Sequence, residues 1–196
     1  MQTFAQLPRI TLDISQGTVD AIPDERLREL AHYWFARRHG NQVPSRADID
    51  PLDFPALLPN IMLLDRVTTP EGDRFRFRLS GTDIALYTGR ELTGKFLDEV
   101  LPATYHEYVD LLNRTVLKTQ LPIYTSSLYH DEGNFVNGIT YRVVMPLRSS
   151  SLQPDRIFVC QFWQRREDRG SWTGNWLSAQ PEIRVLQPPQ AATDIA

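Results

Sequence analysis

The stretch "RFRFRLSGTDI", residues 74–84, contains the pattern from which the fold can be worked out. Phe75, Phe77 and Leu79 alternate with three arginines, and a period of two is typical of a β-strand with one buried face. We therefore expect the apolar row to face an interior. The arginine row is expected to face solvent or a partner protein.

The residues after this strand predict a strand-to-helix turn. Gly81 is expected to relax the backbone there, and Thr82 or Asp83 to cap the helix that follows. Upstream, an apolar run over 60–67 predicts another strand, and the turn sequence 68–73 joins the two. These two strands are expected to pair as a hairpin.

Composition restricts the class of protein. The chain has 196 residues, 41% of them hydrophobic and 23% charged, as in ordinary folded domains. Its net charge of -3 argues against nucleic-acid binding by the whole domain, which usually needs a basic excess. A single cysteine, Cys160, excludes an intramolecular disulfide and a cysteine-based zinc site.

Localisation is judged from the absence of targeting signals. The N-terminal sequence MQTFAQLPRITLDIS has no basic segment followed by an apolar core, as a secretory signal would. No run approaches the roughly 18 apolar residues that a membrane span requires. We expect a cytoplasmic protein without a membrane span.

Residues 24–39 predict an amphipathic helix, with acidic residues in its first turn and Gly40 after its last. Its apolar residues recur at helical spacing, so this face must cover the chain's own sheet or a second subunit. We assign it as a dimer or partner helix and expect a homodimer. The residues on this face are Leu27, Leu30, Ala31, Trp34 and Phe35.

The remaining pattern predicts two short helical segments, a longer helix and three strands joined by hairpins. The predicted class is α+β, with a five-stranded antiparallel sheet and helices on one face, plus the N-terminal helix. The main folded domain, with the N-terminal helix, is expected over 23–166, after a flexible arm, 1–22, and before a partly disordered tail, 167–196. The helices are placed at 82–88, 91–102 and 103–120, and the strands at 121–130, 134–148 and 156–164.

Three stretches resemble a bacterial family of single-domain PAS proteins. They are "PLDFPALLPNIMLLD" (51–65), "FRFRLSGTDIALYTGRELTGKFLDEVLP" (75–102) and "VVMPLRSSS" (143–151). The resemblance covers about residues 24–165 and departs in the turn 149–155, which is longer and lacks a glycine. It implies a sensor or interaction module that acts through a small molecule or a partner protein.

A cavity between sheet and helices is the natural place for a ligand. Gln161 stands where flavin-binding relatives often place a glutamine, although any strand can carry one. The alternative is that the aromatic residues form an ordinary core. The residues assigned to the pocket are Phe75, Phe77, Leu79, Ile84, Tyr87, Tyr108, Leu112, Tyr129, Tyr141, Val159 and Gln161.

Two cofactors are not expected. A photoactive flavin needs a reactive cysteine after the first short helix, where this chain reads GRELTGKFL. Haem needs an axial histidine, and the only geometric candidate, His106, has the features of a solvated residue. No cofactor is required, and a non-covalent small molecule remains compatible with the sequence.

No catalytic constellation is evident. Cys160 has apolar neighbours, as a buried structural thiol does, and the serine runs lack a nucleophile elbow. We expect a signalling sensor or adaptor, not an enzyme, with a signalling protein as its partner. One alternative is a ligand-free interaction adaptor, and another is a small α+β enzyme such as a thioesterase or an isomerase.

Overall fold

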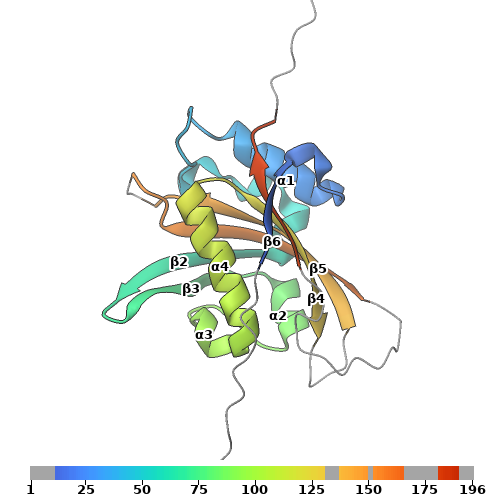
Figure 1. The fold of residues 1–196 in the computed structure, drawn as a ribbon, viewed down its shortest axis with the longest axis vertical. Helices are drawn as coiled ribbons and strands as arrows, with labels where there is room; N and C mark the ends of the chain where they lie inside the picture. Colours follow the sequence, from blue (N-terminus) through green and yellow to red (C-terminus); the bar gives the residue numbers. More distant parts are fainter. Residues whose placement is uncertain (1–11, 131–136, 150–151, 166–180, 190–196) are drawn as a thin grey trace, which may run out of the picture.

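The computed structural model describes residues 12–130, 137–149, 152–165 and 181–189, and its centre is one seven-stranded mixed sheet (Figure 1). Its strands are β1 (Ile14–Thr18), β2 (Ile61–Thr69), β3 (Gly72–Ser80), β4 (Ile123–His130), β5 (Asn137–Leu147), β6 (Arg156–Arg165) and β7 (Glu182–Gln187). They lie in the order β1-β7-β4-β5-β6-β2-β3. The strands β2 to β6 pair antiparallel throughout.

The helices agree with the sequence prediction in order, and three of them nearly in extent, whereas the segment predicted to be helical over 91–102 is an α-helix only over Leu97–Val100. They are α1 (Glu25–Ala36), α2 (Thr82–Thr88), α3 (Leu97–Val100) and α4 (Ala103–Thr119), with short 3-10 turns at Val19–Ala21, Arg46–Asp48, Pro51–Asp53 and Pro55–Asn60. Within the described residues, no helix has an apolar run long enough to cross a membrane.

The sheet has two strands more than the five that were predicted. β7 pairs antiparallel with β4, and β1 pairs parallel with β7, so the sheet is mixed. Both strands come from segments expected to be a loose arm or tail. β7 buries Ile183, Val185 and Leu186. The sequence around this short run contains few apolar residues, so the run was not recognised as a strand. The other parts of these segments, 1–11, 166–180 and 190–196, lie outside the described residues.

Helices cover both faces of this sheet. α2, α3 and α4 pack on one face, and Figure 1 shows α4 crossing the strands there. α1 and the 3-10 turns near residues 46–60 pack on the opposite face. The predicted layer of helices on one face is therefore completed by a second layer on the other.

The apolar face of α1 is buried by the chain itself. All five residues assigned to a dimer or partner helix are in the core formed with β5 and β6. Trp34 is fully buried, and its indole Nε1 donates a hydrogen bond of 2.9 Å to the carbonyl oxygen of Pro146. This corrects the assignment: the face covers the chain's own sheet and is not accessible to a second subunit.

Gly81 is required by a close approach of two backbone segments. Its φ of -67° is available to any residue, but a Cβ there would lie 2.3 Å from the carbonyl oxygen of Pro59. α2 has no side-chain cap from Thr82 or Asp83, contrary to the prediction. Asp83 instead accepts a hydrogen bond of 3.0 Å from Nδ2 of Asn60, which ties α2 to the preceding turn.

Candidate functional site

A cavity of about 230 Å³ lies between the sheet and the helices α2, α3 and α4. An apolar cavity of about 150 Å³ can hold benzene, whereas pockets for drug-sized ligands start at about 300 Å³. The space therefore suits a molecule of about one ring. Its apolar lining is Met62, Leu64, Phe77, Ile84, Leu92, Leu97, Val100, Leu101, Pro102, Val109, Leu112, Val144, Val159 and Trp163, and its polar lining is Thr88, Arg90, Tyr105, Asn113, Arg142 and Gln161.

Seven of the residues assigned to the pocket belong to the cavity face. Five of them line the cavity: Phe77, Ile84, Leu112, Val159 and Gln161. Phe75 and Tyr108 are buried in the core around it without lining it. The sheet therefore presents Val159 and Gln161 of β6 to the cavity. The side chain of Tyr129 lies outside the described residues.

Leu79 does not reach this cavity because β3 contains a β-bulge. Leu64 pairs with Phe77 but Leu63 pairs with Leu79, so Arg78 is an extra residue in the ladder. A bulge shifts the residues beyond it to the other side of the sheet. Leu79 is 42% exposed and lines a groove on the α1 side of the sheet. The assignment of Leu79 to the pocket is thereby corrected.

Two tyrosines assigned to the pocket lie elsewhere. Tyr87 is half-exposed, and its ring stacks on Trp163 with the centroids 4.4 Å apart. Tyr141 packs against the core under α1, and its hydroxyl donates to Gln164 at 2.8 Å. Because adjacent strand residues face opposite ways, Tyr141 points away from the cavity that Arg142 enters.

Arg142 and Asn113 are the main site residues that the sequence analysis missed. Arg142 is 4% exposed and Asn113 is 2% exposed, and both line the cavity. Neither Nε of Arg142 nor Nδ2 of Asn113 has a hydrogen-bond partner. Buried polar groups nearly always have partners, so unsatisfied donors on two residues that line one cavity indicate a place for an acceptor. The available sequence signal for Arg142 was a charged residue directly before the apolar run VVMPL of a predicted strand.

The guanidinium of Arg142 contacts neutral groups. Its Nη2 donates to the Tyr105 hydroxyl and, at 2.9 Å, to Oγ1 of Thr140. Gln161 is its direct cross-strand neighbour on β6, so the two polar side chains share one face. Among the described residues, no carboxylate forms an ion pair with this guanidinium.

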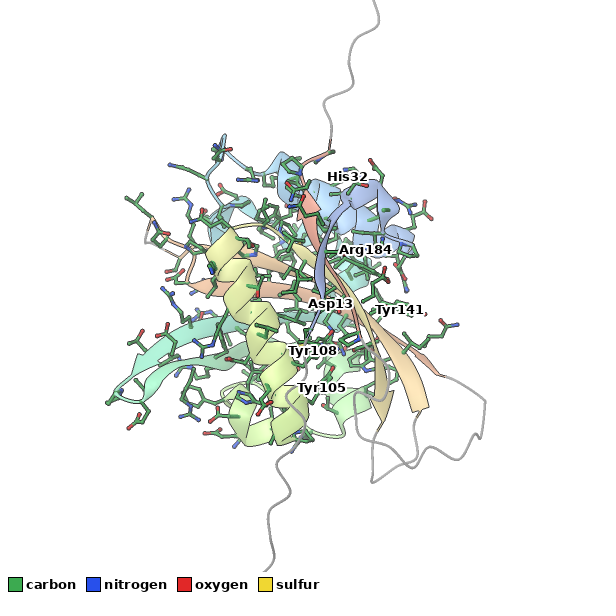
Figure 2. The ribbon with its side chains drawn as sticks, in the orientation of Figure 1. Asp13, His32, Tyr105, Tyr108, Tyr141 and Arg184 are labelled. Atoms are coloured by element: carbon green, nitrogen blue, oxygen red, sulfur yellow. The ribbon has the colours of Figure 1, made fainter. Side chains whose placement is uncertain are left out.

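A hydroxyl network continues from Arg142 under α4. Tyr105 and Tyr108 both lie on α4 (Figure 2), and the Tyr108 hydroxyl shares a hydrogen bond of 2.5 Å with Thr125. Burial raises the pKa of Tyr108, so this phenol is neutral and can donate or accept. Thr140 shares a hydrogen bond of 2.8 Å with Ser127. The network fixes the orientation of the polar end of the cavity.

Cys160 and His106 lie apart from the cavity. Cys160 is fully buried in the core under α1, on the opposite sheet face, and burial raises the pKa of its thiol to about 12. A ligand in the cavity could not react with this thiol across the sheet. His106 does not contribute to the cavity lining. Within the described residues, no group of three or more histidine, cysteine and acidic side chains could hold a metal ion.

Several solved structures are similar to this chain. The structure of VqmA bound to DPO is 14% identical with a TM-score of 0.44, and the match covers 60% of this chain and 58% of VqmA. The LOV protein of Rhodobacter sphaeroides is 16% identical with a TM-score of 0.40, over 58% of this chain and 67% of that one. A fungal LOV domain photoreceptor is 10% identical with a TM-score of 0.38, over 61% and 95%.

The family assignment comes from the sequence itself. A search of curated proteins found no match. The family model described as the PAS domain matches residues 23–161, which is most of the chain and includes every cavity-lining residue except Trp163. The resemblance seen in the motifs is thereby confirmed, and the chain belongs to the PAS domain family.

Proposed function

We propose that this chain is a bacterial signalling sensor that binds a small molecule in the cavity between the sheet and α2–α4. The observation that carries this proposal is the pair of unsatisfied buried donors, Arg142 Nε and Asn113 Nδ2, in an otherwise largely apolar space. Few polar groups in an apolar pocket are the usual composition of a small-molecule site.

Binding is proposed without catalysis. Among the described residues that line the cavity, none is aspartate, glutamate, histidine, serine or cysteine. Those residue types supply most general acids, bases and nucleophiles. This composition supports a sensor over a thioesterase or an isomerase.

The signal is proposed to pass through the packing of the helices on the cavity face. α2, α3 and α4 all contribute side chains to the cavity, so a ligand that prefers one arrangement of these helices shifts the population toward it. A cytoplasmic partner protein, or a second copy in a homodimer, would then read the altered surface. Homodimerisation would use a surface other than the apolar face of α1, which the chain's own sheet covers.

Mass spectrometry of compounds released from the purified, denatured chain tests this proposal. We expect a stoichiometric small molecule from the wild type and none from Val144→Phe, whose larger side chain fills the cavity from β5. Leu152→Phe, at a position that is 83% exposed, is the matched control and should retain the compound. If the wild type releases no compound, and Val144→Phe changes neither dimerisation nor binding to a partner protein, a ligand-free adaptor is favoured.

A further inference from the structure

The charge in the cavity is unusual for a protein interior. Arg142 and Arg90 are both lining residues, and no described lining residue carries a negative charge. Arg142 is buried, whereas Arg90 is exposed and its Nη2 donates to the carbonyl oxygen of Val100. The whole chain has a net charge of -3, so this local excess of positive charge is not a reflection of overall composition. The cavity therefore favours an anion electrostatically.

Arg142 carries most of this preference because it is buried. A buried charge is strongly unfavourable unless a counter-charge or hydrogen bonds compensate it. Here the compensation comes from the Tyr105 and Thr140 hydroxyls and from the ring faces of Tyr105 and Tyr108, with centroids 5.6 and 5.8 Å from the guanidinium carbon. Nε remains without a partner.

Within the described residues neither donor has an acceptor, so a bound molecule can supply one. Guanidinium groups and amides both donate to carboxylate oxygens, and the hydrogen bonds of a guanidinium to a carboxylate are among the strongest in proteins. Asn113 on α4 and Arg142 on β5 approach the cavity from its two layers, helix and sheet. One carboxylate group could accept from both layers.

The rest of the cavity lining indicates the size and polarity of the ligand. Its walls are mainly aliphatic and aromatic, and its volume of about 230 Å³ leaves space for about one ring or a short branched chain. Such walls favour a mainly apolar body, and the few polar lining residues are Thr88, Arg90, Tyr105, Asn113, Arg142 and Gln161.

We propose that the cavity binds a small apolar carboxylic acid, whose carboxylate accepts hydrogen bonds from Arg142 and Asn113. This assignment rests on the proposed sensor function and adds the chemical class of its ligand. The acid supplies the counter-charge that Arg142 lacks, so binding is coupled to the packing between α4 and the sheet.

Calorimetric titration of the full chain tests this assignment with two acids and their neutral isosteres. The probes are benzoate and 3-methylbutanoate against benzamide and 3-methylbutanamide, at about pH 7, where carboxylic acids are ionised. We expect each acid to bind roughly tenfold or more tightly than its amide, as expected for hydrogen bonds to a charged group. Inorganic phosphate, which lacks an apolar body, should bind more weakly than either acid.

Variants of Arg142, with a matched control and a reserve variant of Asn113, locate the interaction. Arg142→Met should bring the acids down to the affinity of the amides, and Arg142→Lys, which keeps the charge, should lie between. Arg76→Met, at an exposed position of β3, is the matched control and should bind like the wild type. If Arg142→Met does not fold, Asn113→Asp gives the same test: its added negative charge should weaken benzoate roughly tenfold more than it weakens benzamide.

Several results would overturn the assignment. They are amides that bind as tightly as acids, acids that bind equally well to Arg142→Met, phosphate that binds more tightly than both acids, or no detectable binding of either acid. If a neutral compound is then released from the wild type but not from Val144→Phe, the sensor proposal holds and only the carboxylic-acid assignment fails. If the wild type releases no compound and none of the probes binds, both the sensor proposal and the carboxylic-acid assignment fail.

Discussion

Cys160 and Gln161 are neighbours on β6, yet they lie in two different environments. Cys160 is in the core under α1, together with Trp34 and Phe158. Gln161 lines the cavity under α2–α4 and pairs across strands with Arg142. The α1 face carries one continuous core of large apolar side chains, with a groove beside Leu79, whereas the cavity face encloses space and a buried positive charge.

This contrast shows how one sheet serves two purposes. Alternation along each strand sends successive side chains to opposite faces, so the two faces can be built independently from one sequence. The α1 face supplies stability through tight packing. The cavity face gives up part of its packing and keeps unsatisfied donors, which is typical of a binding site. Substitutions on the two faces should therefore have opposite consequences.

The largest effect is expected on the α1 face. Trp34→Ala should lower the free energy of unfolding by about 3–5 kcal/mol, because it removes a large buried side chain and leaves the Pro146 carbonyl without its donor. Urea unfolding followed by circular dichroism measures this loss. Leu86→Ala, 77% exposed on α2, should be close to neutral and serves as the control. A loss below about 1 kcal/mol would contradict the view that this face stabilises the fold.

The next effect is expected at the turn where the two faces meet. Gly81→Ala should lower the free energy of unfolding by about 3 kcal/mol, because its Cβ would overlap the Pro59 carbonyl and neither backbone segment can move alone. Gly17→Ala is the matched control, since the nearest atoms there belong to the flexible side chain of Arg184. Equal effects of the two substitutions in urea unfolding would show that the close approach is not the cause.

The cavity face should behave in the opposite way. In the absence of ligand, Arg142→Met should leave the free energy of unfolding unchanged or raise it by up to about 2 kcal/mol, because an apolar side chain replaces a buried charge without a counter-charge. The measurement is urea unfolding of protein stripped of bound compounds. A decrease of about 3 kcal/mol or more in the free energy of unfolding would show that Arg142 is mainly structural. The two faces would then not differ in the way proposed.

The smallest effect is expected from the thiol on the α1 face. Burial raises the pKa of Cys160 from 9.0 to about 12, so the folded state holds this proton more tightly than the unfolded state does. Its contribution is complete below about pH 9 and decreases as the pH rises toward 12, by about 1.4 kcal/mol at pH 10. The wild type should therefore lose more stability than Cys160→Ala between pH 8 and pH 10. Parallel curves for the two proteins would contradict a raised pKa.

Much of the fold could be predicted from local patterns. The alternation in "RFRFRLS" predicts a strand, and β3 spans Gly72–Ser80. The apolar spacing over 24–39 predicts a helix, and α1 spans Glu25–Ala36 with Asp24 as its N-cap. Such elements are visible in the sequence because hydrophobic periodicity and capping act between residues close in the chain.

Fewer residues of the candidate site could be predicted from such local patterns. A bulge at Arg78 displaces Leu79 from the cavity, and its position depends on how β3 pairs with β2. No site role was predicted for Arg142, since a lone arginine in a strand is usually solvated. That it is buried beside Gln161 and under Tyr105 follows from how β5 pairs with β6 and how α4 packs on both strands.

The sequence by itself therefore determined the order of the elements from α1 to β6, the α+β class and the family. Only the tertiary structure decided which surface α1 covers, how β1 and β7 extend the sheet, and which polar side chains enter the cavity. The physical reason is the range of the interactions. Periodicity and caps are set within a few residues, whereas register, burial and the pairing of a charge depend on what the distant parts of the chain bring into contact.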